Sequence, residues 1–136
     1  MIPKVLFVCV ENSCRSQMAE GFARTLGKGV LESWSSGSKP SGKINSTAIE
    51  VMKEKGINLE YQSSKGLDDI PKLKWDYVFT MGCGDACPIV PTKLREDWAI
   101  PDPKNLPLDE FRKVRDQIEQ KVLALIQNIK EGDSHV

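Results

Sequence analysis

The sequence predicts a single α/β domain, in which a four-stranded parallel sheet carries helices on both faces. Short apolar runs alternate along the chain with segments of helical periodicity, a pattern typical of parallel strand-helix units. The chain has 136 residues, enough for one hydrophobic core, and it contains no repeat and no linker. We therefore expect one domain over residues 1–130 and a frayed tail over residues 131–136.

The first elements are the clearest. The apolar run Val5–Val8 is typical of a buried parallel strand. Apolar residues then recur at helical spacing, which predicts a helix over Ser16–Leu26 with Gly27 at its end. A second strand is expected over Val30–Ser35, where the chain resumes after this glycine-rich break.

The remaining elements follow in the same alternation. Thr47–Glu50 has a capping-box pattern, which predicts a helix that continues to Lys55. The apolar segment Asp76–Thr80 predicts a third strand, and Arg95–Ala99 predicts a short fourth strand. Leu108–Lys130 carries a regular apolar stripe opposite a charged face, which predicts a long amphipathic helix packed on the core.

A cysteine and an arginine stand six positions apart between the first strand and the first helix. The segment runs Cys9-Val10-Glu11-Asn12-Ser13-Cys14-Arg15-Ser16. Main-chain N–H groups at a helix N-terminus favour an anion, and Arg15 can bind two of its oxygens with a planar guanidinium. The same field favours the thiolate of Cys9, which is the nucleophilic form. The loop is predicted to bind a tetrahedral oxyanion and to attack it; the alternative is a structural cysteine beside a surface arginine.

We expect the anion to be bound by the loop residues Glu11, Asn12, Ser13, Cys14, Arg15 and Ser16. Asn12 tolerates left-handed backbone angles and can bond across the loop. Ser16 can donate a hydrogen bond to the Cys9 thiolate, or it can cap the first helix. Cys14 is expected to pack in the core, with a lesser chance of pairing with Cys9 on oxidation. The Glu11 carboxylate is expected to point to solvent.

Three further side chains can reach the same edge of the sheet. Asp102 lies between two prolines that stiffen its backbone, so it can serve as a general acid or simply begin a turn. Cys83 and Cys87 lie in a glycine-containing loop after the third strand, where a disulfide can close without strain if their Cα atoms come within about 7 Å. The alternative for this pair is two incidental thiols.

Composition excludes several classes of function. The 19 basic residues balance the 19 acidic ones, so no general attraction to nucleic acid or to a membrane is expected. No apolar stretch is long enough to span a bilayer, and no signal-peptide layout is present, which predicts a cytoplasmic protein with reduced thiols. The only histidine is His135, so we expect no cysteine–histidine dyad. A zinc site of four cysteines is disfavoured by the charge of Arg15, and we expect no metal.

Taken together, these residues resemble the thiol-dependent arsenate reductases of the low-molecular-weight protein tyrosine phosphatase superfamily. The resemblance covers nearly the whole chain and is carried by Phe7–Cys9, Asn12–Gly21, Ser36-Gly37, Ala48–Met52, Cys87-Pro88 and Asp102-Pro103. It implies that Cys9 attacks arsenate held by Arg15, that Asp102 protonates the leaving hydroxyl, and that a second thiol then releases arsenite from the arseno-thiol adduct.

The resemblance leaves the source of the second thiol open. Cys83 followed by Cys87 is the candidate relay within the chain, and an external thiol from glutathione with glutaredoxin, from mycothiol or from thioredoxin is the alternative. Thioredoxin-coupled members space their loop cysteines more widely, so the spacing here is closer to members that use a small thiol or another relay. Some members bind potassium through an aspartate near the loop; this chain offers Lys65 there, and we expect no such site.

Two other functions are compatible with the same loop. One is a low-molecular-weight protein tyrosine phosphatase that hydrolyses phosphotyrosine through a Cys9 phospho-enzyme. Those relatives typically follow the Asp-Pro pair with a tyrosine that stacks on the substrate ring, whereas this chain has Lys104. Weak phosphatase activity is still expected. The other function is a non-catalytic redox or anion sensor, against which the placement of Asp102 argues.

Overall fold

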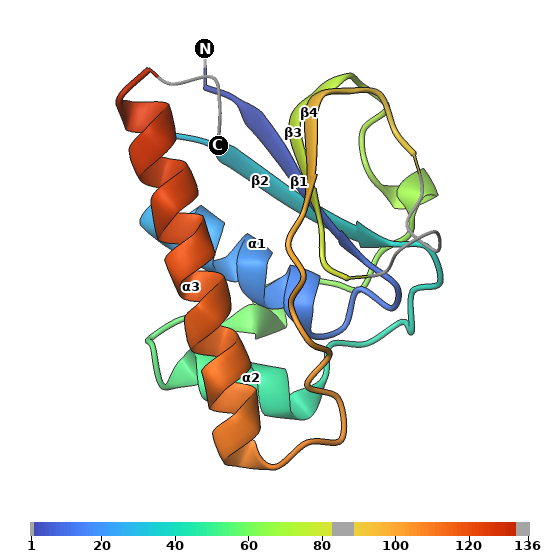
Figure 1. The fold of residues 1–136 in the computed structure, drawn as a ribbon. Helices are drawn as coiled ribbons and strands as arrows, with labels where there is room; N and C mark the ends of the chain where they lie inside the picture. The colour runs from blue at the N-terminus through green and yellow to red at the C-terminus, as the bar shows by residue number, and fades with distance from the viewer. Residues whose placement is uncertain (1, 83–88, 133–136) are drawn as a thin grey trace.

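Four parallel strands form the centre of the computed structural model, which describes residues 2–82 and 89–132 (Figure 1). The strands are β1 (Lys4–Cys9), β2 (Glu32–Gly37), β3 (Trp75–Thr80) and β4 (Thr92–Asp97), in the spatial order β2-β1-β3-β4. Every neighbouring pair is parallel, which confirms the predicted sheet. The strand order reverses between β1 and β3, so the carboxyl ends of these two strands flank the position where such sheets bind ligands.

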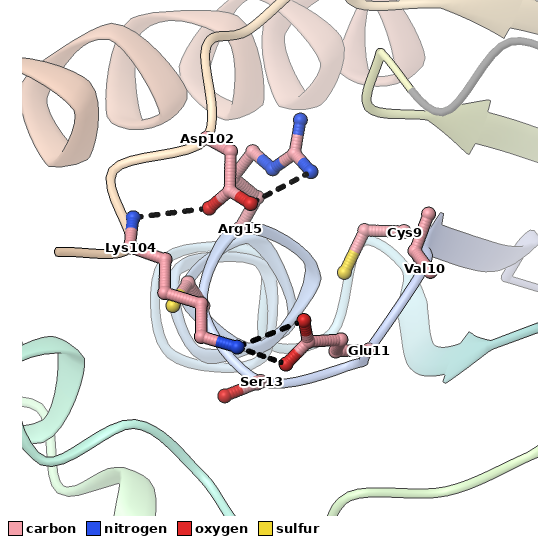
Figure 2. A pocket seen from close by; sticks show the side chains of 8 residues that line it. Cys9, Val10, Glu11, Ser13, Arg15, Asp102 and Lys104 are labelled. Atoms are coloured by element: carbon pink, nitrogen blue, oxygen red, sulfur yellow. Dashed lines mark hydrogen bonds and ion pairs between the residues drawn. The ribbon is translucent and has the colours of Figure 1, made fainter. Parts of the chain in front are cut away.

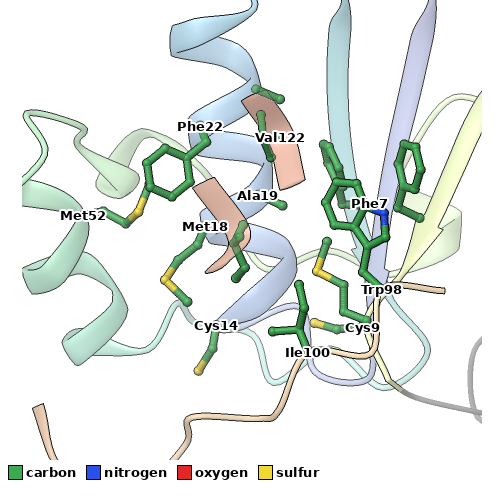
Figure 3. Close-up of a cluster of buried hydrophobic side chains, with 14 of the residues drawn as sticks. Phe7, Cys9, Cys14, Met18, Ala19, Phe22, Met52, Trp98, Ile100 and Val122 are labelled. Carbon is green, nitrogen blue, oxygen red and sulfur yellow. The ribbon is translucent and has the colours of Figure 1, made fainter. Parts of the chain in front are cut away.

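Three α-helices lie on one side of the sheet: one packs directly on the strands, and the other two pack with it in a helical layer (Figure 1). They are α1 (Arg15–Leu26), α2 (Ser46–Lys53) and α3 (Leu108–Lys130). Figure 3 shows the core beneath them, where Phe7 of β1, Met18 and Phe22 of α1 and Val122 of α3 have no exposed surface. Full burial of such a side chain contributes about 1.5–3 kcal/mol. The predicted apolar stripe of α3 is the buried face of that helix.

The opposite face of the sheet differs from the expectation of a helical layer. Within the described residues it is covered by one short 3-10 helix, η2 (Leu67–Asp69), and by the segments beside it. Leu67, Ile70 and Leu73 pack there against Leu6 and Val8 of β1. Pro71 follows this segment and has no backbone N–H group to donate to the hydrogen bonds of a longer helix. The segment therefore covers the sheet with only a short 3-10 helix.

Helix α2 begins earlier than the sequence predicted. The side chain of Asn45 accepts hydrogen bonds from the backbone of Thr47 at 2.8 Å and of Ala48 at 3.2 Å, so Asn45 is the N-cap. The capping box expected at Thr47–Glu50 is therefore wrong. Asparagine is among the strongest N-cap residues, and it precedes the threonine in the chain.

Strands β2 and β4 are each displaced by a few residues from their predicted positions. Strand β2 starts at Glu32 instead of Val30, because a glycine turn at Gly29 delays its start. It ends at Gly37 instead of Ser35, because Gly37 still pairs with Cys9 at the end of β1. Strand β4 starts at Thr92 instead of Arg95, and Trp98 follows the strand, stacked on Phe79 with ring centroids 4.4 Å apart. Residues of β4 alternate between exposed and half-buried, as expected at an edge of the sheet.

Candidate active site

A pocket of about 250 Å³ opens where β1 ends and α1 begins (Figure 2). Its lining comes from the loop between these elements and from the segment before α3, and it consists of Cys9, Val10, Glu11, Ser13, Cys14, Arg15, Asp102 and Lys104. The predicted strand–loop–helix setting of the cysteine and the arginine is therefore observed. The structure also brings Asp102 to this pocket from 93 residues further along the chain than Cys9.

The sulfur of Cys9 lies at the buried end of the pocket, with 3% of the residue exposed. The hydroxyl oxygen of Ser16 is 2.8 Å from this sulfur. Asn12 donates its amide N–H to the same hydroxyl oxygen at 2.8 Å, so the Ser16 hydrogen is free to point at sulfur. A hydroxyl that donates to sulfur stabilises a thiolate there. Ser16 does not cap α1, because Cys14 occupies the N-cap position.

Asn12 holds the loop in its curved shape. Its φ angle is 50°, in the left-handed region that was expected for this residue. Its side-chain oxygen accepts hydrogen bonds from Gln17 at 2.8 Å and from the backbone of Lys65 at 2.7 Å. Gly37 lies against the loop, and a Cβ there would be 2.5 Å from the carbonyl oxygen of Val10. A larger residue at the end of β2 would therefore displace the loop.

Arg15 is buried, and its guanidinium has two differently occupied ends. Nη1 donates a hydrogen bond to the carbonyl oxygen of Met81, which follows β3. It also donates to the carbonyl oxygen of Ile100, at 2.9 Å. Nη2 faces the pocket and lies 3.8 Å from the Asp102 carboxylate. Gly82 has a φ angle of +74°, and a Cβ at this position would be 3.3 Å from Nη1. The glycine allows the chain after β3 to pass close to the arginine.

Asp102 is presented at the open side of the pocket. Half of its side chain is exposed, and its Oδ1 accepts a hydrogen bond from the backbone of Lys104 at 3.0 Å. Its other oxygen faces Arg15. The carboxyl group is thus oriented from both sides while it stays accessible to a substrate, as a general acid requires.

Cys14 is buried, as the sequence predicted, with 5% of the residue exposed. Burial and, to a lesser extent, the negative charge of Asp102 raise the pKa of its thiol to about 12. Cys14 is therefore a neutral thiol at physiological pH and adds no negative charge beside a bound anion.

Glu11 does not simply point to solvent, so that expectation is wrong. Its carboxylate lines the pocket and binds the ammonium group of Lys104 at 2.9 Å. The hydrogen bond and the charge of Glu11 raise the pKa of Lys104. In the sequence, Lys104 was notable only because related phosphatases have a tyrosine at this position. Its pairing with Glu11 could not be predicted, because no local pattern links residues so far apart in the chain.

Some residues singled out in the sequence are not among those that line this pocket. Cys83 and Cys87 lie outside the described residues, as does His135. Lys65 lies beside the loop, where its ammonium group donates to the carbonyl oxygen of Ser63 at 2.8 Å and pairs with Glu20 at 3.4 Å.

Among residues 2–82 and 89–132, no three histidine, cysteine, aspartate or glutamate side chains cluster as a metal site would require. No helix in this part of the chain has the length and apolarity to cross a membrane.

Comparison with known proteins gives consistent matches over most of the chain. The family model described as low molecular weight phosphotyrosine protein phosphatase matches residues 4–135. The chain is 43% identical over 129 residues to the glutaredoxin arsenate reductase of Synechocystis sp., covering 93% of this chain and 98% of that protein.

Solved structures agree with these sequence matches. A structure described as an arsenate reductase in the phosphate binding state is 40% identical, with a TM-score of 0.84, and the match covers 94% of this chain and 99% of that one. The thioredoxin-dependent arsenate reductase of Corynebacterium glutamicum is 31% identical, with a TM-score of 0.78, over 97% of this chain and 64% of that one.

Proposed function

Because this chain belongs to the low molecular weight phosphotyrosine protein phosphatase family, we propose that it is an arsenate reductase that works through the pocket at Cys9. The observation that carries the proposal is that Asp102, from a distant part of the chain, lies in the same pocket as Cys9 and Arg15 of the anion loop. The Cys9 sulfur has the Ser16 hydroxyl at 2.8 Å, and the guanidinium of Arg15 and the carboxyl group of Asp102 line the same pocket. Relatives that match almost end to end carry the name arsenate reductase.

The first half of the reaction uses these residues directly. The Cys9 thiolate attacks arsenic and forms a sulfur–arsenic bond, while Arg15 binds the oxygens of the anion. Asp102 donates its proton to the departing hydroxyl, which leaves as water. Ser16 stabilises the thiolate before the attack, and the loop N–H groups at the start of α1 stabilise the anion.

The second half of the reaction needs another thiol. That thiol attacks the Cys9 sulfur, the sulfur–arsenic bond breaks, and its electron pair stays on arsenic, which leaves as arsenite. Cys9 and the second thiol become a disulfide. Cys83 is the proposed attacking thiol. Cys87 then attacks Cys83 in the Cys9–Cys83 disulfide, which frees Cys9, and an external thiol reduces the resulting Cys83–Cys87 disulfide. This is supported by the chain path, because Gly82 lies against Arg15 and directly precedes Cys83 in the sequence.

The external reductant is proposed by class. One relative is named a glutaredoxin arsenate reductase and another a thioredoxin-dependent one, so both systems are candidates beside mycothiol. Each of them requires reduced cysteines, which supports a cytoplasmic location. The test is arsenite production from arsenate with each system in turn. If arsenite is produced with just one of these systems, that system is the reductant. If it is produced with none of them, the proposed function is overturned.

The relay can be tested separately from the first step. Cys9→Ser should abolish all turnover. Cys83→Ser and Cys87→Ser should stop repeated arsenate reduction but spare hydrolysis of an activated phosphate ester. Mass mapping after one turnover in wild-type protein should find a disulfide that contains Cys83. If both loop variants cycle arsenate at the wild-type rate, an external thiol attacks Cys9 instead.

We also infer weak phosphatase activity, because the same thiolate, guanidinium and acid can cleave a phosphate ester. Among the described residues that line the pocket, none is aromatic, so a phosphotyrosine ring gains no stacking there. Hydrolysis of p-nitrophenyl phosphate should therefore be detectable but slow. Phosphotyrosine-peptide hydrolysis at a much higher efficiency than arsenate reduction would place the phosphatase function first.

A further inference from the structure

An ion pair crosses the mouth of the pocket (Figure 2). The ammonium nitrogen of Lys104 lies 2.9 Å and 3.0 Å from the two carboxylate oxygens of Glu11, so the lysine binds both of them. Glu11 comes from the loop before α1, and Lys104 comes from the segment before α3. Both line the pocket together with Cys9.

The backbone on each side of the pair is fixed. The carbonyl oxygen of Glu11 accepts hydrogen bonds from the backbone of Ser41 at 3.0 Å and from the hydroxyl of Ser64 at 3.1 Å. These contacts hold the main chain from outside the pocket, and Figure 2 shows the Glu11 side chain directed toward Lys104. The backbone of Lys104 donates to Asp102 at 3.0 Å. The ion pair therefore joins the anion loop to the segment that carries Asp102.

The charge balance of the pocket depends on this pair. Among the described residues that line the pocket, Glu11 and Asp102 are acidic and Arg15 and Lys104 are basic, so the formal charges of these four side chains cancel. Without Lys104, the Glu11 carboxylate would face an incoming oxyanion with no partner and repel it. Without Glu11, the lysine would add an unpaired positive charge at the mouth. The affinity for an oxyanion should therefore change when one member of the pair is removed without the other.

The Glu11–Lys104 pair forms a charged rim at the mouth of the pocket, and this rim affects which class of substrate the pocket accepts. The pair presents charged, hydrated groups where the described lining offers no aromatic surface. A compact inorganic oxyanion can keep part of its hydration at such a rim, whereas an aryl ester must place its ring against the two charges without a stacking partner.

We propose that the Glu11–Lys104 ion pair is the specificity element of this pocket: Lys104 cancels the one carboxylate of the anion loop, and the charged rim selects an inorganic oxyanion over a phosphoaryl ester. For arsenate as the natural anion, this rests on the proposed function. The selection itself applies to any tetrahedral oxyanion that the loop binds.

Phosphate affinity tests the charge balance without any reductase turnover. Calorimetric titration with inorganic phosphate would be run on wild-type protein, Lys104→Met, Glu11→Gln, the double variant and the charge swap Glu11→Lys/Lys104→Glu. We expect Lys104→Met to bind phosphate about tenfold more weakly and Glu11→Gln to bind it a few times more tightly. The double variant and the swap should return to within about threefold of wild type. Lys113→Met, which removes the same charge from an exposed site outside the pocket, should change nothing.

Selectivity is measured on the same proteins. The double variant, whose rim is uncharged, should raise kcat/KM for p-nitrophenyl phosphate at least about threefold relative to that for methyl phosphate. The proposal is overturned if Lys104→Met matches Lys113→Met in phosphate affinity, if the double variant and the swap bind phosphate as weakly as Lys104→Met, or if the double variant keeps the wild-type ratio of kcat/KM for the two esters. Failure to reduce arsenate with any thiol system would reject the reductase assignment only, because phosphate binding and ester hydrolysis do not require it.

Discussion

The buried thiol of Cys14 predicts that the protein loses stability in alkaline solution by a defined amount. Burial raises the pKa of this thiol from 9.0 to about 12 in the folded protein. Above pH 9 the unfolded chain releases the proton while the folded chain keeps it, so the unfolded state binds fewer protons. Stability therefore falls as the pH rises from 9 toward 12, and below pH 9 the thiol contributes no pH dependence.

The size of the effect follows from the same linkage. Each pH unit in this window costs about 1.4 kcal/mol, so the free energy of unfolding should drop by about 2 kcal/mol between pH 9 and about pH 10.5 from Cys14 alone. Lysine and tyrosine groups also titrate at alkaline pH, so the effect of Cys14 must be isolated by comparison. Cys14→Ala removes the thiol and leaves the other groups in place.

The assay is urea denaturation of wild-type protein and of Cys14→Ala from about pH 8 to about pH 10.5. The variant starts less stable because it leaves a small cavity, and this difference should shrink steadily above pH 9 as the wild type loses stability. A difference that stays constant over the whole range would refute the raised pKa and, with it, the neutral state of Cys14 beside the anion site.

Other predictions concern the loop and the acid. Ser16→Ala removes a hydrogen bond to a charged sulfur, worth about 1.5–3 kcal/mol, so alkylation of Cys9 by iodoacetamide at neutral pH should slow about tenfold or more; an unchanged rate would contradict the hydrogen bond. Asp102→Asn should slow a single turnover of arsenate about a hundredfold or more while phosphate still binds; equal rates would exclude it as the acid. Asn12→Ala should lower the free energy of unfolding by about 1–3 kcal/mol in urea denaturation, because it removes buried hydrogen bonds at a left-handed position; a change below about 0.5 kcal/mol would contradict this.

The sequence was a good guide where one segment determines its own structure. Strand β1 has a continuous apolar run, and α3 has a full apolar stripe, so their positions could be predicted closely. Strand β4 is half-exposed at an edge and lacks either signal, and serines interrupt β2. Their bounds depend on pairing with neighbouring strands, which no local pattern encodes.

The same distinction holds for the pocket. Cys9, Arg15 and Ser16 lie within one short segment, so their joint placement followed from the strand and helix around them. The position of Asp102 was suggested by its prolines, but its approach to Arg15 depends on how the segment before α3 crosses the molecule. The pairing of Glu11 with Lys104 joins residues 93 positions apart, and only the folded chain reveals it.

The two ends of the Arg15 guanidinium limit what can replace it. One nitrogen is committed to carbonyl groups on two separate segments, and only the other faces the pocket. Lysine would keep the positive charge, but its single ammonium centre cannot span both places at once. A lysine would have to leave either the anion or the two carbonyl oxygens unbound. We therefore infer that no other natural amino acid at this position keeps both anion binding and the hydrogen bonds that join the loop to the segments of Met81 and Ile100.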